Sequence, residues 1–455
     1  GSTVYSLSTG APTATNLFDT ATGDRLFLIN DGNDVVGYVG LSSDEAFRVS
    51  VDANGNVTLN QLRAIRHTNT ANPDEASAPL TPASIKLTAL VTDRDGDEIS
   101  KTLDIGGTVS FKDDAPTITV VAAAPTLQVD ESALASGAQI PTAPYSSIAT
   151  ADFSSVFAHA YGADGAGTLL YSLTTNEAAT GLLDSLTNQA ISLVQVGNNI
   201  VGRAAGNDVF QVSVDANGNV TLNQFRSIIH ANGANPDDVS AAIAANAITL
   251  TAFITDRDGD SANTAIAIGD KFSFRDDAPS VSTNTVSTVL EVDETVLTSN
   301  DSENFASAFT VNYGADGAGS TVYSLGVSSA GEDSLLDDVA SGNSIYLYEN
   351  AGVIYGQVNN TTGIYDASGI NAFTLTVNSA TGDVTLDQIR AITHPTGGNA
   401  SPDELVRIAA GTVSLTATVT DKDNDTASTS IDLGVKVGFR DDAPSVSTNT
   451  VSTVL

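Results

Sequence analysis

Residues 248–260 read Ile-Thr-Leu-Thr-Ala-Phe-Ile-Thr-Asp-Arg-Asp-Gly-Asp, a predicted β-strand that runs directly into a loop with three aspartates. The loop string at 255–260 also occurs at 92–97, and with Lys and Asn replacing Arg and Gly at 420–425. A second string, Phe-Lys/Arg-Asp-Asp-Ala-Pro, recurs with the same period at 111–116, 274–279 and 439–444. A fixed period of this kind predicts one structural module written three times.

The period predicts where the modules begin and end. We expect a partial first module at 1–116, a second at 117–279, a third at 280–444 and the start of a further repeat at 445–455. Residues 274–290 recur unchanged at 439–455, and residues 1–7 match 319–325. The sequence therefore enters the repeat out of phase. A cut within a longer protein explains this more simply than a strand supplied by a neighbouring chain in a fibre.

Within each module the local signals are almost entirely those of β-structure. Residues 47–51 and 57–61 alternate apolar with polar side chains around an Asp-Ala-Asn-Gly-Asn turn, which predicts a hairpin that recurs at 210–224 and 373–388. Further strands are expected at 85–91, 248–254 and 413–419, and at 108–111 and its counterparts. A short helical turn is expected around Ile65, Ile228 and Ile392. The predicted fold class is all-β: tandem immunoglobulin-like β-sandwich modules in a linear array, with extra strands because the modules are long.

Composition excludes several classes of protein. With 18 Lys+Arg against 54 Asp+Glu, the net charge of −36 is far too negative for a nucleic-acid binder. The absence of Cys excludes disulfides and cysteine-based zinc sites. No apolar run approaches the ~18 residues of a membrane span, and no leader peptide opens the sequence, so we expect neither membrane insertion nor a signal peptide.

The aspartate-rich loops predict a site for a hard cation. Three carboxylates at alternate positions after a strand end can converge, and calcium takes six to eight oxygen ligands in flexible geometry. The spacing is not that of an EF-hand. Two further acidic strings accompany the loop in the repeat, namely Asp-Asp-Ala-Pro and Val-Asp-Glu. The candidate calcium ligands are Asp93, Asp95, Asp97, Asp113, Asp114, Asp130, Glu131, Asp256, Asp258, Asp260, Asp276, Asp277, Asp293, Glu294, Asp421, Asp423, Asp425, Asp441 and Asp442.

These acidic strings are expected to meet at the junctions between modules. The Asp-rich loop precedes the Asp-Asp-Ala-Pro string that ends its module, and Val-Asp-Glu follows shortly in the next, so the three are expected to share one junction. Close carboxylates repel one another, so a counter-charge is needed. The alternative is a solvated acidic loop, or ion pairs with the interleaved Arg94, Arg257 and Lys422.

Other repeated residues are expected to be structural. The Gly-Ala-Asp-Gly-Ala-Gly strings at 162–167 and 314–319 lack the Lys-Ser/Thr of a phosphate loop and predict a tight turn, from which Asp164 or Asp316 could still lend an oxygen to an ion. A hydrogen-bonding role is expected for His67, His230 and His394, each of which follows an Arg by four residues. The sequence has no Gly-x-Ser-x-Gly elbow, no His-Glu-x-x-His helix and no nucleophilic cysteine. Paired carboxylates could serve a glycosidase, but these recur in every module, so we expect no enzymatic activity.

Taken together, these strings resemble the large tandem repeats of type I-secreted RTX adhesins over nearly the whole chain. In that family, immunoglobulin-like extender modules rigidified by calcium hold a ligand-binding region away from the bacterial cell. The resemblance implies calcium at the Asp-rich loops and the junction carboxylates. The Asp-Asp-Ala-Pro string also looks like the acidic linker of cadherins. Asn424 departs from the pattern because it replaces the loop glycine.

The sequence therefore predicts a calcium-rigidified extender of a secreted bacterial surface adhesin, which supports attachment or biofilm formation outside the cell. Its expected partners are calcium ions and the neighbouring modules of the same chain. One rival is a subunit of a self-assembling extracellular fibre or surface layer, which would polymerise. The other is a carbohydrate-binding module, which would need an exposed aromatic platform, although the chain has no Trp.

Overall fold

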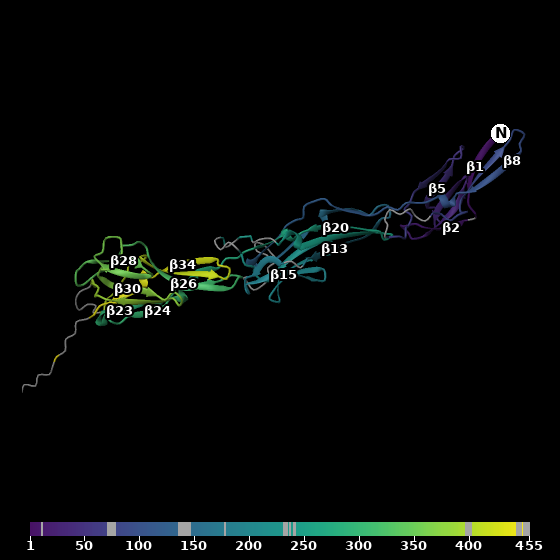
Figure 1. The fold of residues 1–455 in the computed structure, drawn as a ribbon. Coiled ribbons are helices and arrows are strands. Elements are labelled where there is room, and N and C mark those ends of the chain that lie inside the picture. The colour runs from purple at the N-terminus through teal and green to yellow at the C-terminus, as the bar shows by residue number, and fades with distance from the viewer. Residues whose placement is uncertain are drawn as a thin grey trace, which may run out of the picture.

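The computed structural model describes residues 1–10, 12–70, 79–134, 147–176, 179–230, 235, 238–239, 243–395, 403–442 and 448. Regular structure in these residues consists of β-strands and single 3₁₀ turns. The units follow one another in a line from the purple N-terminal end to the yellow C-terminal end (Figure 1). The predicted all-β class and linear tandem array are therefore confirmed. Apart from Thr448, residues 445–455 lie outside the described residues, as does the further repeat expected there.

Three separate hydrophobic cores define what we call the first, second and third modules. Their buried residues run from Leu7 to Phe111, from Ile118 to Phe274 and from Leu290 to Phe439. The exact boundaries at 116 and 279 remain predictions.

The first module has a five-stranded sheet, β2-β3-β4-β5-β6, and a three-stranded sheet, β1-β7-β8. Its elements are β1 (Ser2–Ser8), β2 (Thr13–Phe18), β3 (Arg25–Asp31), β4 (Asp34–Val39), β5 (Glu45–Val51), β6 (Val57–Gln61), β7 (Lys86–Thr92), β8 (Glu98–Asp104) and η1 (Gly106–Thr108).

The second module has a six-stranded sheet, β11-β18-β17-β16-β15-β14, a three-stranded sheet, β13-β19-β20, and the pairs β10-β21 and β9-β12. Its elements are β9 (Thr117–Val120), β10 (Leu127–Asp130), η2 (Glu131–Ala133), β11 (Ile148–Asp152), η3 (Ser154–Val156), β12 (Phe157–Ala160), β13 (Ala166–Thr175), β14 (Ala179–Asp184), β15 (Gln189–Val196), β16 (Asn199–Ala204), β17 (Asn207–Val214), β18 (Asn219–Gln224), η4 (Ala245–Ala247), β19 (Ile248–Asp256), β20 (Ser261–Ala267), η5 (Gly269–Lys271) and β21 (Phe272–Arg275).

The third module repeats this plan with the sheets β24-β31-β30-β29-β28-β27, β26-β33-β34 and β23-β35-β32, and the pair β22-β25. Its elements are β22 (Ser280–Thr283), β23 (Leu290–Asp293), η6 (Glu294–Val296), β24 (Asp301–Asn304), η7 (Ala306–Ala308), β25 (Phe309–Asn312), β26 (Ala318–Val327), β27 (Glu332–Asp337), β28 (Ser344–Asn350), β29 (Val353–Val358), β30 (Asn371–Val377), β31 (Asp383–Gln388), β32 (Leu405–Arg407), β33 (Val413–Asp421), β34 (Thr426–Asp432), η8 (Gly434–Lys436) and β35 (Val437–Arg440).

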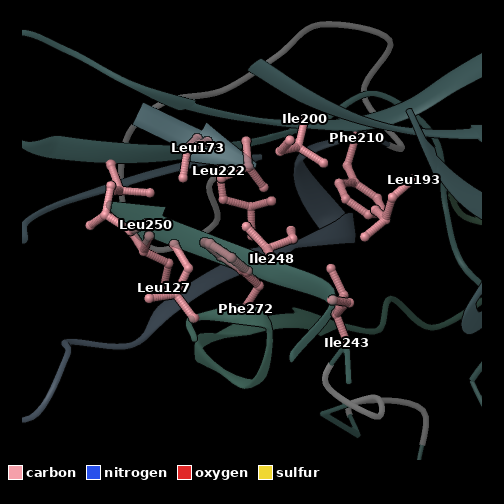
Figure 2. Packing of buried hydrophobic residues seen from close by; sticks show 14 of the residues in the cluster. Leu127, Leu173, Leu193, Ile200, Phe210, Leu222, Ile243, Ile248, Leu250 and Phe272 are labelled. Atoms are coloured by element: carbon pink, nitrogen blue, oxygen red, sulfur yellow. The ribbon is translucent and has the colours of Figure 1, made fainter. Parts of the chain in front are cut away.

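The core of the second module shows how the layers pack. Ile200 and Phe210 from the six-stranded sheet face Leu250 from the three-stranded sheet and Phe272 from β21 (Figure 2). Phe210 also contacts Phe274, with 5.1 Å between the ring centroids. Burying such side chains is the main stabilising contribution to each module, at about 25 cal/mol per Å² of apolar area.

Two local predictions are wrong. The residues around Ile65, Ile228 and Ile392 form no helical turn; each isoleucine makes an isolated antiparallel bridge, to Asp19, Asp184 and Asp338 respectively. Residues 108–111 form no strand, whereas their counterparts form β21 and β35, which pair in parallel with β10 and β23. No strand among the described residues of 1–116 holds the position of β10.

Candidate metal centres at the module junctions

The Asp-rich loop takes its shape from its own first aspartate. In the second module Asp256 Oδ1 accepts hydrogen bonds from the backbone N–H groups of Gly259 at 3.1 Å and Asp260 at 2.8 Å. Gly259 has a φ of +110°, a value at which most side chains are strained. Asn424 holds the equivalent position at +87°, and asparagine is among the few residues that tolerate positive φ. The third copy therefore keeps the turn without glycine.

Each loop lies at the end of its module that faces the preceding module. The backbone N–H of His67 donates to Asp258 Oδ2 at 3.1 Å, and that of His230 donates to Asp423 Oδ2 at 3.3 Å. The loop of a module therefore reaches back into the module before it. The first copy, Asp93 to Asp97, lies at the outer end of the first module and is exposed.

The acidic strings meet at junctions, but in a different combination from the expected one. Strand β10 runs parallel to β21, which brings Asp130 opposite Arg275 and places Glu131 at the far end of the second module. Glu131 therefore lies with Asp276 and Asp277 of its own module and not with Asp113. The expected order was wrong because a strand running the length of the module separates Val-Asp-Glu from the string that precedes it in sequence.

The junction between the second and third modules gathers buried carboxylates from both. Oxygens of Glu131, Asp276, Asp277 and Asp316 lie within 4.8 Å of one another. None of the carboxylates in this cluster is more than 5% exposed. The cluster comprises Glu131, Asp276 and Asp277 from the second module and Asp316, Asp421, Asp423 and Asp425 from the third.

Several oxygens in this cluster have no hydrogen-bond donor. Glu131 is anchored through Oε1, which accepts from the Gln224 amide at 2.6 Å and from the Ile228 N–H at 3.0 Å. Its Oε2, like Asp421 Oδ2 and Asp423 Oδ1, is buried and accepts no hydrogen bond from an amide, hydroxyl or cationic group among the described residues. Such buried, unsatisfied oxygens are costly unless a cation binds them.

The pKa values of these carboxylates also indicate that the cluster lacks a positive counter-charge. Burial and neighbouring carboxylates raise the pKa of Asp276 to about 10, and those of Asp316 and Asp421 to about 8. Burial, with a smaller repulsion from Asp316, raises the pKa of Glu131 well above its usual range. These carboxylates are therefore poorly compensated by the protein itself.

The junction between the first and second modules is a less buried version of the same arrangement. His67, Asp113 and Asp258 lie together there. Burial is the main cause that raises the pKa of Asp113 to about 8, that of Asp164 to about 7 and that of Asp256 to about 6. Asp260 is also buried. No described residue of 1–116 takes the place of Glu131 at this junction.

The glycine-rich loop belongs to the junction, although the sequence favoured a simple turn. Asp316 is fully buried and Asp164 is 4% exposed, so both lie inside a junction and not in a solvated turn. The loop is held by the second aspartate of Asp-Asp-Ala-Pro: the Ala315 N–H donates to both oxygens of Asp277 at 3.0 Å, and Ala163 N–H donates to Asp114 Oδ2 at 2.9 Å. The sequence did contain a signal for this burial: a single aspartate in a Gly/Ala loop that recurs with the same period as the other acidic strings.

The histidines lie beside the carboxylates. His230 Nδ1 is 3.3 Å from Asp276 Oδ1, and its Nε2 is 3.3 Å from the Phe274 carbonyl oxygen. His67 is placed in the same way against Asp113, at 3.1 Å, and Phe111. The Nε2 contacts agree with the hydrogen-bonding role expected for His67 and His230. His394 differs, because its Nε2 is 3.6 Å from Glu294 Oε1, beyond hydrogen-bond distance.

The remaining candidate ligands are less well placed. Asp130 and Asp293 each cap a 3₁₀ turn, accepting from the N–H groups of Ser132 and Thr295. Asp293 is exposed, as is Asp442. Asp441 lies with Glu294 and His394 at the far end of the third module.

The sequence also failed to show how the basic residues are used. Arg63, Arg226 and Arg390 each form a two-point ion pair with a buried aspartate of the same module, Asp19, Asp184 and Asp338. The basic side chains of two Asp-rich loops make hydrogen bonds to the preceding module. Arg257 donates to the Ala21 carbonyl and Lys422 donates to the Leu186 carbonyl, both at 3.1 Å. Both contacts add to the junctions between modules.

Comparison with known proteins identifies a family. The family model described as "Domain of unknown function (DUF5801)" matches residues 1–106, 126–269 and 289–434. This chain belongs to that family. The three DUF5801 matches fall one on each module core. No curated protein matches the chain.

Some solved structures have low similarity to this DUF5801 chain. "Protocadherin gammaB7 EC3-6 cis-dimer structure" has a TM-score of 0.21 and 11% identity, covering 96% of this chain and 76% of that one. "Ca2+-stabilized adhesin helps an Antarctic bacterium reach out and bind ice" has a TM-score of 0.16 and 12% identity, covering 96% and 94%. "Crystal structure of tetra-tandem repeat in extending region of large adhesion protein" has a TM-score of 0.13 and 14% identity, covering 95% and 100%. No helix in the described part of the chain could span a membrane.

Proposed function

We propose that this chain is a calcium-stiffened spacer from the extender region of a large secreted bacterial adhesin. One observation carries the proposal: carboxylates from two consecutive modules are buried together, and several of their oxygens have no donor. Each described junction repeats the arrangement, which is expected of a mechanical role and not of a single catalytic site.

The chemistry of the donors selects the cation. The cluster offers many carboxylate oxygens and no cysteine in an irregular arrangement, which suits calcium better than zinc, copper or the strictly octahedral magnesium ion. Calcium at the second junction would be held by Glu131 and Asp276 from one side and by Asp316, Asp421 and Asp423 from the other. At the first junction Asp113, Asp256 and Asp258 would take part.

The position of the cluster gives the ion a mechanical effect. Because its ligands come from both modules, a bound ion opposes rotation of one module against the next. The modules already lie in a line (Figure 1), so fixing each junction favours an extended rod. A rod is what a spacer needs to hold a distal binding region away from a surface.

Calcium also gives a reason for the chain to stiffen outside the cell. The resemblance of its repeated strings to RTX adhesin extenders implies export followed by folding in a calcium-rich medium. A ligand present at about 1,000 times its Kd stabilises the folded state by about 4 kcal/mol per site. In a calcium-poor cytosol that contribution is absent.

The test combines calcium titration calorimetry, differential scanning calorimetry and small-angle X-ray scattering on the whole chain. We expect saturable calcium binding, a higher Tm and a longer, stiffer particle in calcium than in chelator. Magnesium at the same concentration is the control and should not reproduce the change. Unchanged melting and unchanged particle length in calcium and chelator would overturn the proposal.

A further inference from the structure

The connection between β29 and β30 in the third module is longer than its counterpart in the second. Strands β16 and β17 of the second module are joined by Ala205 and Gly206 alone, whereas residues 359–370 join β29 to β30. We call residues 359–370 the inserted loop. It carries a tyrosine, Tyr365, for which the short connection of the second module has no equivalent.

Hydrogen bonds hold the inserted loop against β29. Gln357 Nε2 donates to the Asp366 carbonyl at 2.8 Å, and the Asp366 N–H donates to Gln357 Oε1 at 3.0 Å. Asn360 Nδ2 also donates to Gln357 Oε1, at 2.8 Å, and Tyr348 Oη donates to the Asn360 carbonyl at 2.6 Å. Gln357 is fully buried. Tyr365, next to Asp366 in the sequence, is therefore held beside β29.

Tyr365 lies against Tyr355 of β29. The ring centroids are 4.6 Å apart and the ring planes are tilted by 39°. Both residues are partly exposed to solvent. Burial and, next, the hydroxyl group of Tyr355 raise the pKa of Tyr365, so the hydroxyl ends of the two rings lie close together. In the part of the chain that the structure describes, no other two tyrosine rings are in contact.

The composition of the chain directs oxidation to such a pair. Cysteine and methionine, which oxidants commonly attack, are absent, and so is tryptophan. Tyrosine is then the side chain from which a one-electron oxidant most readily removes an electron. Because there is no cysteine, the chain has no disulfide to fasten a loop, whereas coupling of two tyrosines remains open to it.

We propose that Tyr355 and Tyr365 form a site of oxidative cross-linking, at which a haem peroxidase with hydrogen peroxide joins the two rings as dityrosine. Each phenol loses one electron and one proton to give a phenoxyl radical. A carbon–carbon bond then forms between the ring carbons next to the two oxygens, and the hydrogen on each of these carbons moves to the oxygen to restore the phenol. The two electrons and two protons reduce hydrogen peroxide to two water molecules. The product fastens the inserted loop to β29 by a bond that does not depend on calcium.

The experiment treats the whole chain with peroxidase and hydrogen peroxide, at a concentration low enough to suppress coupling between chains. It is run in calcium and in chelator, and the same result is expected in both, so it is separate from the proposed calcium function. Cleavage after acidic residues then releases residues 350–366, in which Tyr355 and Tyr365 are the only tyrosines. We expect this peptide to lose the mass of two hydrogen atoms, to show dityrosine fluorescence and to give no backbone fragments between residues 355 and 365 in mass spectrometry.

Matched variants locate the cross-link. Tyr365→Phe should abolish the change in the 350–366 peptide, because phenylalanine has no phenolic hydrogen to lose. Tyr346→Phe, at another partly exposed tyrosine of the third module, should leave the change as in the wild type. Circular dichroism melting checks that both variants fold. An unmodified 350–366 peptide in the folded wild type, under conditions that couple free N-acetyltyrosine, would overturn the proposal, as would the same change in folded Tyr365→Phe.

Discussion

The backbone N–H of Ala315 donates to both carboxylate oxygens of Asp277, at 3.0 Å each, across the boundary between the second and third modules. The two aspartates of this Asp-Asp-Ala-Pro string thus have different contacts: Asp276 faces the buried cluster, and Asp277 holds the backbone of the next module. The junction is therefore a direct contact between two modules of the chain as well as a candidate ion site.

A methyl group at Gly314 should disrupt this contact. A Cβ there would lie 2.4 Å from Asp277 Oδ2, and the residue has a φ of +75°. Gly206→Ala is the matched control, because Gly206 has a φ of +84° with nothing within 4 Å. Both changes should lower stability by about 1 kcal/mol through backbone strain. Only Gly314→Ala should also shorten the particle in small-angle scattering. Equal scattering curves for the two variants would contradict a role of the Ala315–Asp277 contact in aligning the modules.

The same loop position should matter only where a preceding module is present. Asp258→Asn removes a charge from the first junction, and Asp423→Asn does so at the second. Both should reduce the number of calcium ions counted by titration calorimetry and lower the Tm in calcium. Asp95→Asn, in the exposed first copy, should change neither. If Asp95→Asn removes as many ions as Asp258→Asn, each loop binds calcium without help from its neighbour.

Without calcium, acid should stabilise the junctions. The folded-state pKa values of Asp276, Asp316 and Asp421, about 10, 8 and 8, lie above the ordinary 3.8. At pH values between 3.8 and these raised pKa values, the folded chain binds more protons than the unfolded chain. The free energy of unfolding therefore falls as the pH rises. In chelator, Tm should therefore be higher near pH 5 than near pH 8. In calcium the trend should reverse, because protons compete for the same oxygens; the same trend in both buffers would contradict this.

Breaking one of the buried Arg–Asp pairs should be strongly destabilising, because it leaves a buried charge without its counter-charge. Arg226→Ala leaves the Asp184 carboxylate, whose side chain is 0% exposed, without its cation and should cost about 3 kcal/mol. Arg203→Ala breaks the exposed pair with Asp208 and should cost less than about 1 kcal/mol. Hydrogen exchange of residues 219–229, followed by mass spectrometry, isolates the second module from the others. Equal exchange in the two variants would show that burial of Asp184 does not matter.

Many of the strands could be predicted from short stretches of sequence. The hairpin expected at 210–224 is β17 and β18, and the strand expected at 248–254 is β19, because alternation and turn residues act over a few positions. The bridge at Ile228 was missed because it depends on Asp184, far away in sequence. The complete burial of Asp316 was missed for the same reason, because the sequence of a Gly/Ala loop does not show which distant residues cover it.

The repeat, the all-β class and the acidic residue types were determined by the sequence alone, because periodicity and composition need no knowledge of distant contacts. Only the tertiary structure decided which carboxylates share a junction. Because β10 pairs in parallel with β21, Glu131 lies at the same end of the second module as Asp276. Strand β19 runs toward the preceding module, so the loop after it places Asp258 next to His67. Strand direction and pairing are non-local, so residues adjacent in sequence were separated and residues 191 positions apart were joined.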